Sequence, residues 1–150
     1  MVQETLLTKK AEETRQWGQA LAQRLSPGDI IALIGELGAG KTVLAQGILK
    51  GLGVEETVQS PSFIMAREYV GRFPVVHIDL YRLRDSHDFL DLGFSEYFDG
   101  RNVVVIEWAE KILDLLPTHH HQIHLTWDVN EQNRRSIMHR YSSDVEENAR

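Results

Sequence analysis

The chain has 150 residues, a formal net charge of −6 and no cysteine. Its length is typical of one domain, and the lack of cysteine excludes disulfides, thiolate metal sites and a cysteine nucleophile. The negative charge argues against a protein that grips RNA or DNA by itself, because nucleic acid is also a polyanion. No stretch of the sequence approaches the roughly 18 apolar residues of a membrane span, and residues 1–10 lack a signal-peptide pattern. We therefore expect a cytoplasmic protein with no membrane attachment.

The first third of the chain predicts a helix, a buried strand and a second helix. Thr8 is a candidate N-cap for a helix that runs to about Leu25, because apolar side chains recur there at spacings of three and four. After a turn at 26–29, residues 30–34 are nearly all apolar, which is typical of a strand covered on both faces in a parallel sheet. Residues 41–52 again carry apolar side chains on one helical face.

The rest of the chain predicts an alternation of short strands and helices. Strands are expected over 63–69, 75–80, 103–106, 122–127 and 136–141, and helices over 87–98 and 110–116. The first two strands are close enough to form a hairpin, and the last two look like edge strands. We expect one α/β domain over 1–141, with a mostly parallel sheet flanked by helices and antiparallel edge strands, and a polar, frayed tail at 142–150.

Residues 35–42 read Gly-Glu-Leu-Gly-Ala-Gly-Lys-Thr, which is the pattern G-x-x-x-x-G-K-[ST]. Backbone N–H groups can hold phosphates only where the chain wraps closely, and Gly35 and Gly40 carry no Cβ to block that wrap. Lys41 would place a charge at the β- and γ-phosphates, and Thr42 would offer a hydroxyl to Mg²⁺. A strand before the loop and a helix after it are the context that this motif requires. The sequence therefore predicts a P-loop NTPase-like fold that binds a nucleoside triphosphate with Mg²⁺.

Motifs that are missing from the sequence narrow the nucleotide and the subclass. There is no Asn-Lys-x-Asp motif to read guanine and no Leu-Ser-Gly-Gly-Gln transporter signature. The chain after the loop is short for a kinase with a lid and an acceptor pocket. ATP is therefore the expected nucleotide.

Two acids that follow apolar runs are candidates to bind the metal ion and to orient the attacking water. A P-loop site needs an acid at the end of a neighbouring strand to hold or orient Mg²⁺. Glu107 follows the run at 103–106, and Asp79 follows the run at 75–78. A surface acid at a strand end is the plainer alternative for each, but beside a P-loop we favour function for both. Trp108 is more often a core or shelf residue than a nucleotide-stacking one.

Several histidines and arginines can be interpreted either as functional residues or as structural or solvated ones. His77 is by default a structural residue in a strand. The histidines at 119–121 and His124 could suggest a metal, but a polar loop is favoured because no acid or thiol ligands accompany them. The arginines within 81–84 and at 134–135 could stabilise phosphate charge or could form solvated basic patches.

Five blocks of sequence occur in an order that resembles one protein family. They are Leu-Gly-Ala-Gly-Lys-Thr at 37–42, Ser-Pro-Ser-Phe at 60–63, His-Ile-Asp-Leu-Tyr-Arg-Leu at 77–83, Leu-Gly at 92–93 and Ile-Glu-Trp-Ala-Glu at 106–110. Together they resemble the TsaE family, also called YjeE, from Thr8 to about Arg135. The P-loop is shared by many families, whereas the block at 77–83 combined with Ile-Glu-Trp is far more specific.

The resemblance implies a small bacterial P-loop ATPase needed to make threonylcarbamoyladenosine at position 37 of tRNA. Such proteins are weak ATPases alone and act with TsaB and TsaD, where TsaD carries the threonylcarbamoyl transfer. Contact with tRNA would then be indirect, through the complex.

The same resemblance implies roles for individual residues. Asp79 would act in hydrolysis by positioning water, and Lys41 would act on the phosphates. Thr42 and Glu107 would hold Mg²⁺, while residues 60–63 would form a mobile loop near the γ-phosphate. Trp108 would sit by the site or a partner surface. The phosphate-binding residues would be Glu36, Leu37, Gly38, Ala39, Gly40, Lys41 and Thr42.

One departure and two alternatives remain. The family usually reads Ser-Pro-Thr where this chain has Ser60-Pro61-Ser62, and serine keeps the hydroxyl. From the residues alone, a small-molecule kinase of the P-loop type or a nucleotide-dependent regulatory binding protein would also fit.

Overall fold

The computed structural model describes residues 2–36, 38–59, 61, 65–127 and 134–141. Its strands are β1 (Val2–Thr8), β2 (Ile30–Gly35), β3 (Ala66–Val70), β4 (Pro74–Asp79), β5 (Val103–Glu107), β6 (His121–Trp127) and β7 (Arg135–Tyr141). Its helices are α1 (Ala11–Ala22), α2 (Lys41–Gly51), α3 (Ser86–Asp91) and the 3-10 helices η1 (Phe94–Tyr97) and η2 (Ala109–Leu115). The predicted tail at 142–150 and most of the predicted loop at 60–63 lie outside the described residues. No helix within the described residues is long and apolar enough to cross a membrane.

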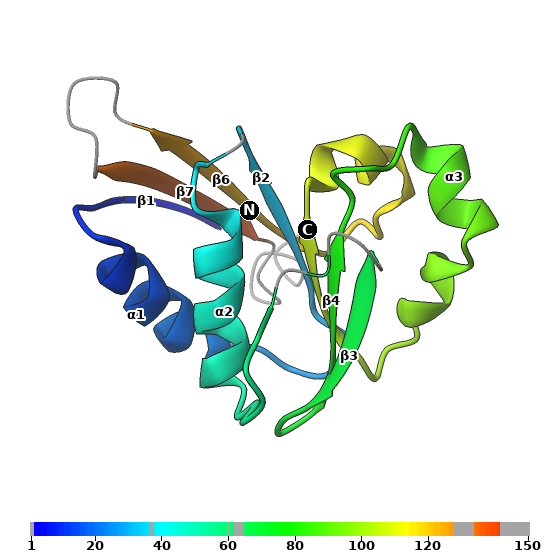
Figure 1. Ribbon diagram of the computed structural model, residues 1–150, viewed down its shortest axis with the longest axis horizontal. Helices are drawn as coiled ribbons and strands as arrows, with labels where there is room; N and C mark the ends of the chain where they lie inside the picture. Colours follow the sequence, from blue (N-terminus) through cyan, green and yellow to red (C-terminus); the bar gives the residue numbers. More distant parts are fainter. Residues whose placement is uncertain (1, 37, 60, 62–64, 128–133, 142–150) are drawn as a thin grey trace.

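The strands form one seven-stranded sheet in the order β1-β7-β6-β2-β5-β4-β3, with helices on both faces (Figure 1). The four central strands, β6, β2, β5 and β4, pair in parallel. The remaining pairings, of β3 with β4, β6 with β7 and β7 with β1, are antiparallel. The α/β class, the antiparallel edges and the hairpin of β3 and β4 are confirmed, although the parallel pairings are confined to the centre.

The prediction that 122–127 and 136–141 form edge strands is wrong. β6 lies between β7 and β2, and β7 lies between β6 and β1, so the edges of the sheet are β1 and β3. The reason is the strand β1, which the sequence did not predict and which covers β7.

The start of the first helix also differs from the prediction. Thr8 is the last residue of β1 and does not cap α1, whose N-cap position is occupied by Lys10. The Thr8 hydroxyl is buried and lies 2.8 Å from the hydroxyl of Thr14, one turn into the helix. The alternating burial of β1 has the period of two expected for a strand, and the helix begins three residues later.

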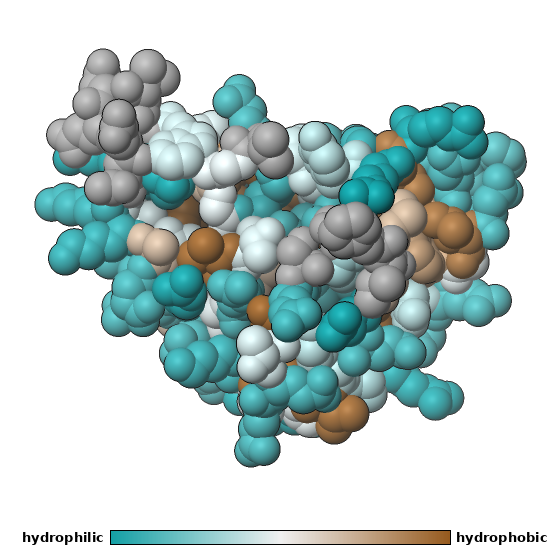
Figure 2. Space-filling model, viewed as in Figure 1, coloured by the Kyte–Doolittle hydropathy of each residue, from teal (hydrophilic) through white to brown (hydrophobic). Residues whose placement is uncertain are grey.

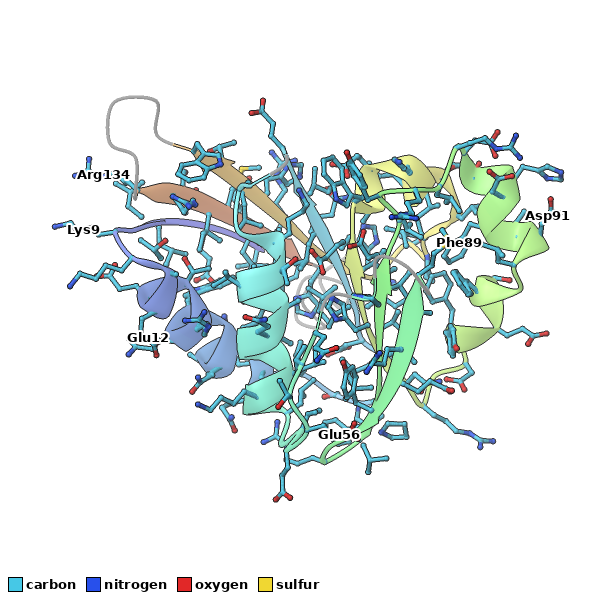
Figure 3. The ribbon with its side chains drawn as sticks, viewed as in Figure 1. Lys9, Glu12, Glu56, Phe89, Asp91 and Arg134 are labelled. Carbon is cyan, nitrogen blue, oxygen red and sulfur yellow. The ribbon has the colours of Figure 1, made fainter. Side chains whose placement is uncertain are left out.

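The core has two halves because side chains of the central strands alternate between the faces of the sheet. In β2, Ile31 packs with the side of the sheet covered by α1 and α2, whereas Ile30 packs with the side covered by α3 and η2. Phe89 points from α3 toward the sheet (Figure 3) and is fully buried. The outer surface is mostly hydrophilic, with apolar side chains gathered near α3 (Figure 2), where Leu90 and Leu92 are 47% and 49% exposed.

A buried histidine joins the first strand to the last. His139 of β7 lies with Nδ1 3.1 Å from the Glu4 carboxylate of β1 and with Nε2 2.9 Å from Nδ1 of His121. A neutral imidazole satisfies both contacts if Nδ1–H donates to Glu4 and Nε2 accepts from His121. Burial lowers the pKa of His139, against the hydrogen bond to Glu4, which raises it.

The stability of the fold is expected to fall between about pH 7 and pH 5 because of His139. With its pKa lowered in the folded protein, the unfolded chain takes up the proton first, which favours unfolding as the pH drops below about 6.5. His139→Gln removes this group, so its urea midpoint should change less over that interval than that of the unchanged protein. The exposed His87→Gln is the matched control and should retain the full pH dependence. An equal dependence in the His139 variant would contradict the assignment.

Candidate functional site

The glycines of the predicted loop shape a turn from β2 into α2. Gly40 has φ of 102° and occupies the N-cap position of α2, a left-handed conformation that favours glycine. Gly35, at the end of β2, packs so closely that an added Cβ would lie 2.5 Å from the carbonyl oxygen of Leu125 in β6. The loop therefore opens directly onto a helix N-terminus, where backbone N–H groups attract anions. Leu37, a predicted phosphate contact, lies outside the described residues.

Lys41 is folded back against the loop. Its Nζ donates to the carbonyl oxygens of Gly35 and Glu36, the latter at 2.9 Å. The same ammonium lies 3.7 Å from the ring centroid of Trp108, and the residue is only 5% exposed. Burial lowers the pKa of Lys41, against the attraction of Glu110 and Glu107. The predicted phosphate ligand is thus held in place by carbonyls and an indole.

Thr42 and Glu107 meet across the site as the metal prediction requires. The Thr42 hydroxyl donates to Oε1 of Glu107 at 2.7 Å. The other oxygen, Oε2, lies 2.6 Å from Nε2 of His77 in β4. Glu107 is 2% exposed and His77 is fully buried. His77, which the sequence left as a structural residue, therefore orients the carboxylate that faces the loop.

Asp79 lies directly beside Glu107, because the two residues are register partners at the ends of the parallel strands β4 and β5. Its Oδ1 accepts from the backbone N–H of Tyr81 at 2.9 Å, and the side chain is 5% exposed. The structure thus brings both predicted acids to the carboxyl ends of the central strands, where the loop leaves β2.

The sequence made no prediction for Glu110, and it placed Trp108 by the site without its backbone conformation. Glu110, in η2, accepts from the backbone N–H of Gly35 at 3.4 Å, and burial raises its pKa. Trp108 has φ of 60° and ψ of 38°, a left-handed conformation rare for a bulky residue. This turn swings the indole over Lys41. The sequence signal that could have indicated Glu110 was its position three residues after Glu107, which ends a buried strand.

A cavity of about 440 Å³ lies over the loop. Lys41 and Thr42 line it on the loop side, and Asp79, Glu107 and Trp108 line it on the side of β4 and β5. Two further side chains, Tyr81 and Arg135, complete its wall. Most of the residues predicted to bind a phosphate chain and a metal ion therefore share one space.

Other sequence candidates are placed elsewhere or are not gathered into a site. Arg84 pairs with Asp88 on α3, at 2.9 Å. His121 and His124 lie on β6, so the predicted polar loop ends before them. Within the described part of the chain, no group of three or more His, Cys, Asp or Glu side chains could hold a metal ion.

Comparison with known proteins connects the site to one family. Residues 8–137 match the family described as "Threonylcarbamoyl adenosine biosynthesis protein TsaE". The chain is 42% identical over 117 residues to the tRNA threonylcarbamoyladenosine biosynthesis protein TsaE of Bacillus subtilis, covering 77% of this chain and 73% of that protein. It is 39% identical over 111 residues to the TsaE protein of Treponema pallidum, covering 74% and 82% of the two chains.

A solved structure shares the fold over nearly the whole chain. The crystal structure of YdiB from Bacillus subtilis superimposes with a TM-score of 0.80 at 32% sequence identity. The match covers 97% of this chain and 90% of YdiB.

Proposed function

The chain belongs to the TsaE family, and from that premise we propose that it is the ATP-binding and ATP-hydrolysing subunit in tRNA threonylcarbamoyladenosine biosynthesis. It would act at position 37 of tRNA together with TsaB and TsaD, and would meet tRNA only through that complex. The observation that carries the ATPase part is the 2.7 Å contact between Thr42 of the loop and Glu107 of β5. This contact joins the phosphate loop to a buried acid.

The donors at this contact fit Mg²⁺ bound together with ATP. Mg²⁺ prefers hard oxygen ligands, and protein sites commonly supply one or two of them while phosphates and water supply the rest. Thr42 and Glu107 offer one hydroxyl and one carboxylate, which is such a set. When bound, the ion would neutralise charge that develops on the phosphates.

Asp79 is the residue proposed to position the attacking water. It is buried beside Glu107 but has its own hydrogen bond, from the Tyr81 N–H, which holds one oxygen in place. An acid so oriented at the cavity wall can accept a hydrogen bond from water in line with the phosphate. Lys41 would supply charge to the β- and γ-phosphates after leaving the carbonyls of Gly35 and Glu36.

The arrangement of Lys41 supports weak ATP binding by the isolated protein. The ammonium must exchange two carbonyl contacts and the Trp108 ring for phosphate, which costs part of the binding energy. A partner that shifts Trp108 would lower this cost. The half-exposed Leu90 and Leu92 near α3 offer such a partner apolar surface to bury.

The proposal predicts slow phosphate release by the isolated protein and faster release when TsaB and TsaD are added. We expect a stimulation of about 10-fold or more, which corresponds to about 1.4 kcal/mol off the barrier. The measurement is free phosphate from ATP with the protein alone, with both partners, and with the partners alone as the control. Absence of both stimulation and complex formation would refute the partner-dependent ATPase.

The same assay separates the other two classes. A small-molecule kinase would transfer phosphate to an acceptor and release little of it free. A regulatory binding protein would support threonylcarbamoyladenosine formation even when its turnover is removed.

A further inference from the structure

An arginine and a tryptophan form a stacked pair where β6 ends and β7 begins. Trp127 is the last residue of β6, Arg135 is the first residue of β7, and the two are register partners. The Arg135 guanidinium carbon lies 3.2 Å from the centroid of the Trp127 ring. Because the guanidinium is planar, this distance requires it to lie over the ring.

The pair adjoins the phosphate loop on the side opposite the acids. A Cβ added to Gly38 would lie 3.5 Å from Trp127 Nε1, and one added to Gly40 would lie 3.7 Å from Arg135 Nε. The acids Asp79 and Glu107 lie on β4 and β5, which follow β2 in the sheet order, whereas β6 and β7 precede it. Arg135 also lines the cavity that contains Lys41 and Thr42.

These positions give the bound nucleotide a direction, if the proposed ATPase function is correct. The γ-phosphate end belongs with Thr42 and Glu107, where the metal would lie. The phosphate chain then runs along the loop away from β5, so the nucleoside leaves the loop toward β6 and β7.

We propose that Arg135, supported by Trp127, is the stacking platform for the adenine base of ATP. A guanidinium that lies over an indole presents its flat face, which is the face that stacks on a purine. The phosphates already have Lys41 and the helix N-terminus as positive partners. This role rests on the proposed function above and adds to it the contact for the base. The sequence alone left two interpretations of Arg135, a phosphate contact or part of a solvated basic patch.

The test compares ATP with inorganic tripolyphosphate, which has the phosphates without the base. Arg135→Lys keeps the positive charge but loses the planar group, and Arg140→Lys in the same strand is the matched control, since Arg140 pairs with Gln3 outside the cavity. By calorimetric titration with Mg²⁺, Arg135→Lys should weaken ATP about 10-fold. Tripolyphosphate should change by less than about 2-fold, and the control should change neither ligand.

Two outcomes of this titration would overturn the proposal. An equal loss for ATP and tripolyphosphate would make Arg135 a phosphate ligand, and no loss for either would make the pair a structural support. A second measurement on the unchanged protein does not depend on the folding of a variant. Photolysis with 8-azido-ATP should label the ends of β6 and β7, and labelling confined to the side of Tyr81 and Trp108 would overturn the assignment. If the unchanged protein binds no ATP, the proposed function fails first.

Discussion

Replacing Lys41 with alanine should abolish the rise in melting temperature that ATP and Mg²⁺ give the unchanged protein. ATP at about 100 times its dissociation constant stabilises a folded protein by about 2.7 kcal/mol. Removing one partner of a buried charge pair costs about 2–5 kcal/mol of binding, so the variant should bind too weakly for a shift at the same concentration. The reason is local, because Lys41 is the buried cation at the loop.

The matched control for this variant is Lys50→Ala, at the exposed end of the same helix. It removes the same charge and should retain the full ATP-dependent shift. Both variants are also melted without ligand, because Lys41→Ala deletes the contacts to Gly35, Glu36 and Trp108. If the Lys41 variant keeps an undiminished ATP shift, the P-loop assignment is wrong.

Asp79→Asn should separate binding from turnover. A residue that takes or orients a proton in the transition state contributes about 10²–10⁴-fold to the rate, and phosphate release should fall by that factor. Asparagine keeps an oxygen that can accept from the Tyr81 N–H, so the strand end and ATP affinity should be retained. The measurements are phosphate release with TsaB and TsaD and calorimetric ATP binding.

The control for Asp79 is Asp114→Asn, an exposed acid in η2 that does not line the cavity. It should leave both measurements unchanged. Unaltered turnover in Asp79→Asn would remove that residue from hydrolysis. A variant without turnover that still supports threonylcarbamoyladenosine formation would favour the regulatory binding protein.

The elements around the site could be predicted because their signals are local. The apolar run at 30–34 and the helical period at 41–52 correspond to β2 and α2, and the glycines between them explain the turn. Strands β4 and β5 likewise end at the predicted acids Asp79 and Glu107.

Strand β1 could not be predicted, because its hydrophobic pattern follows its burial only in part. Leu6 packs against the core, but Leu7 is 58% exposed and the charged Glu4 contacts His139. The strand is held by its pairing with β7, which is distant in the sequence. No window of neighbouring residues contains that partner, and the same gap made β6 and β7 look like edges.

Within the site, the contacts that could not be predicted also depend on residues that are distant in the sequence or on the backbone conformation. The pairing of Glu107 with His77 needs the register of β4 and β5, and the cover over Lys41 needs the left-handed turn at Trp108. The stacking of Arg135 on Trp127 depends on the register of β6 and β7.

The pairing of β1 with β7 also sets an order for biosynthesis. Glu4 and His139, which touch across these strands, are 135 positions apart, so β1 is synthesised long before the strand that it pairs with. Strands β2, β4 and β5, with both acids and the loop, are made before β7 and can pair while β1 is still without its partner. A ribosome that stalls before residue 135 would leave β6 as an open edge, the kind of surface that recruits other chains. The nascent protein would then carry the proposed site residues in place while its sheet was still unfinished.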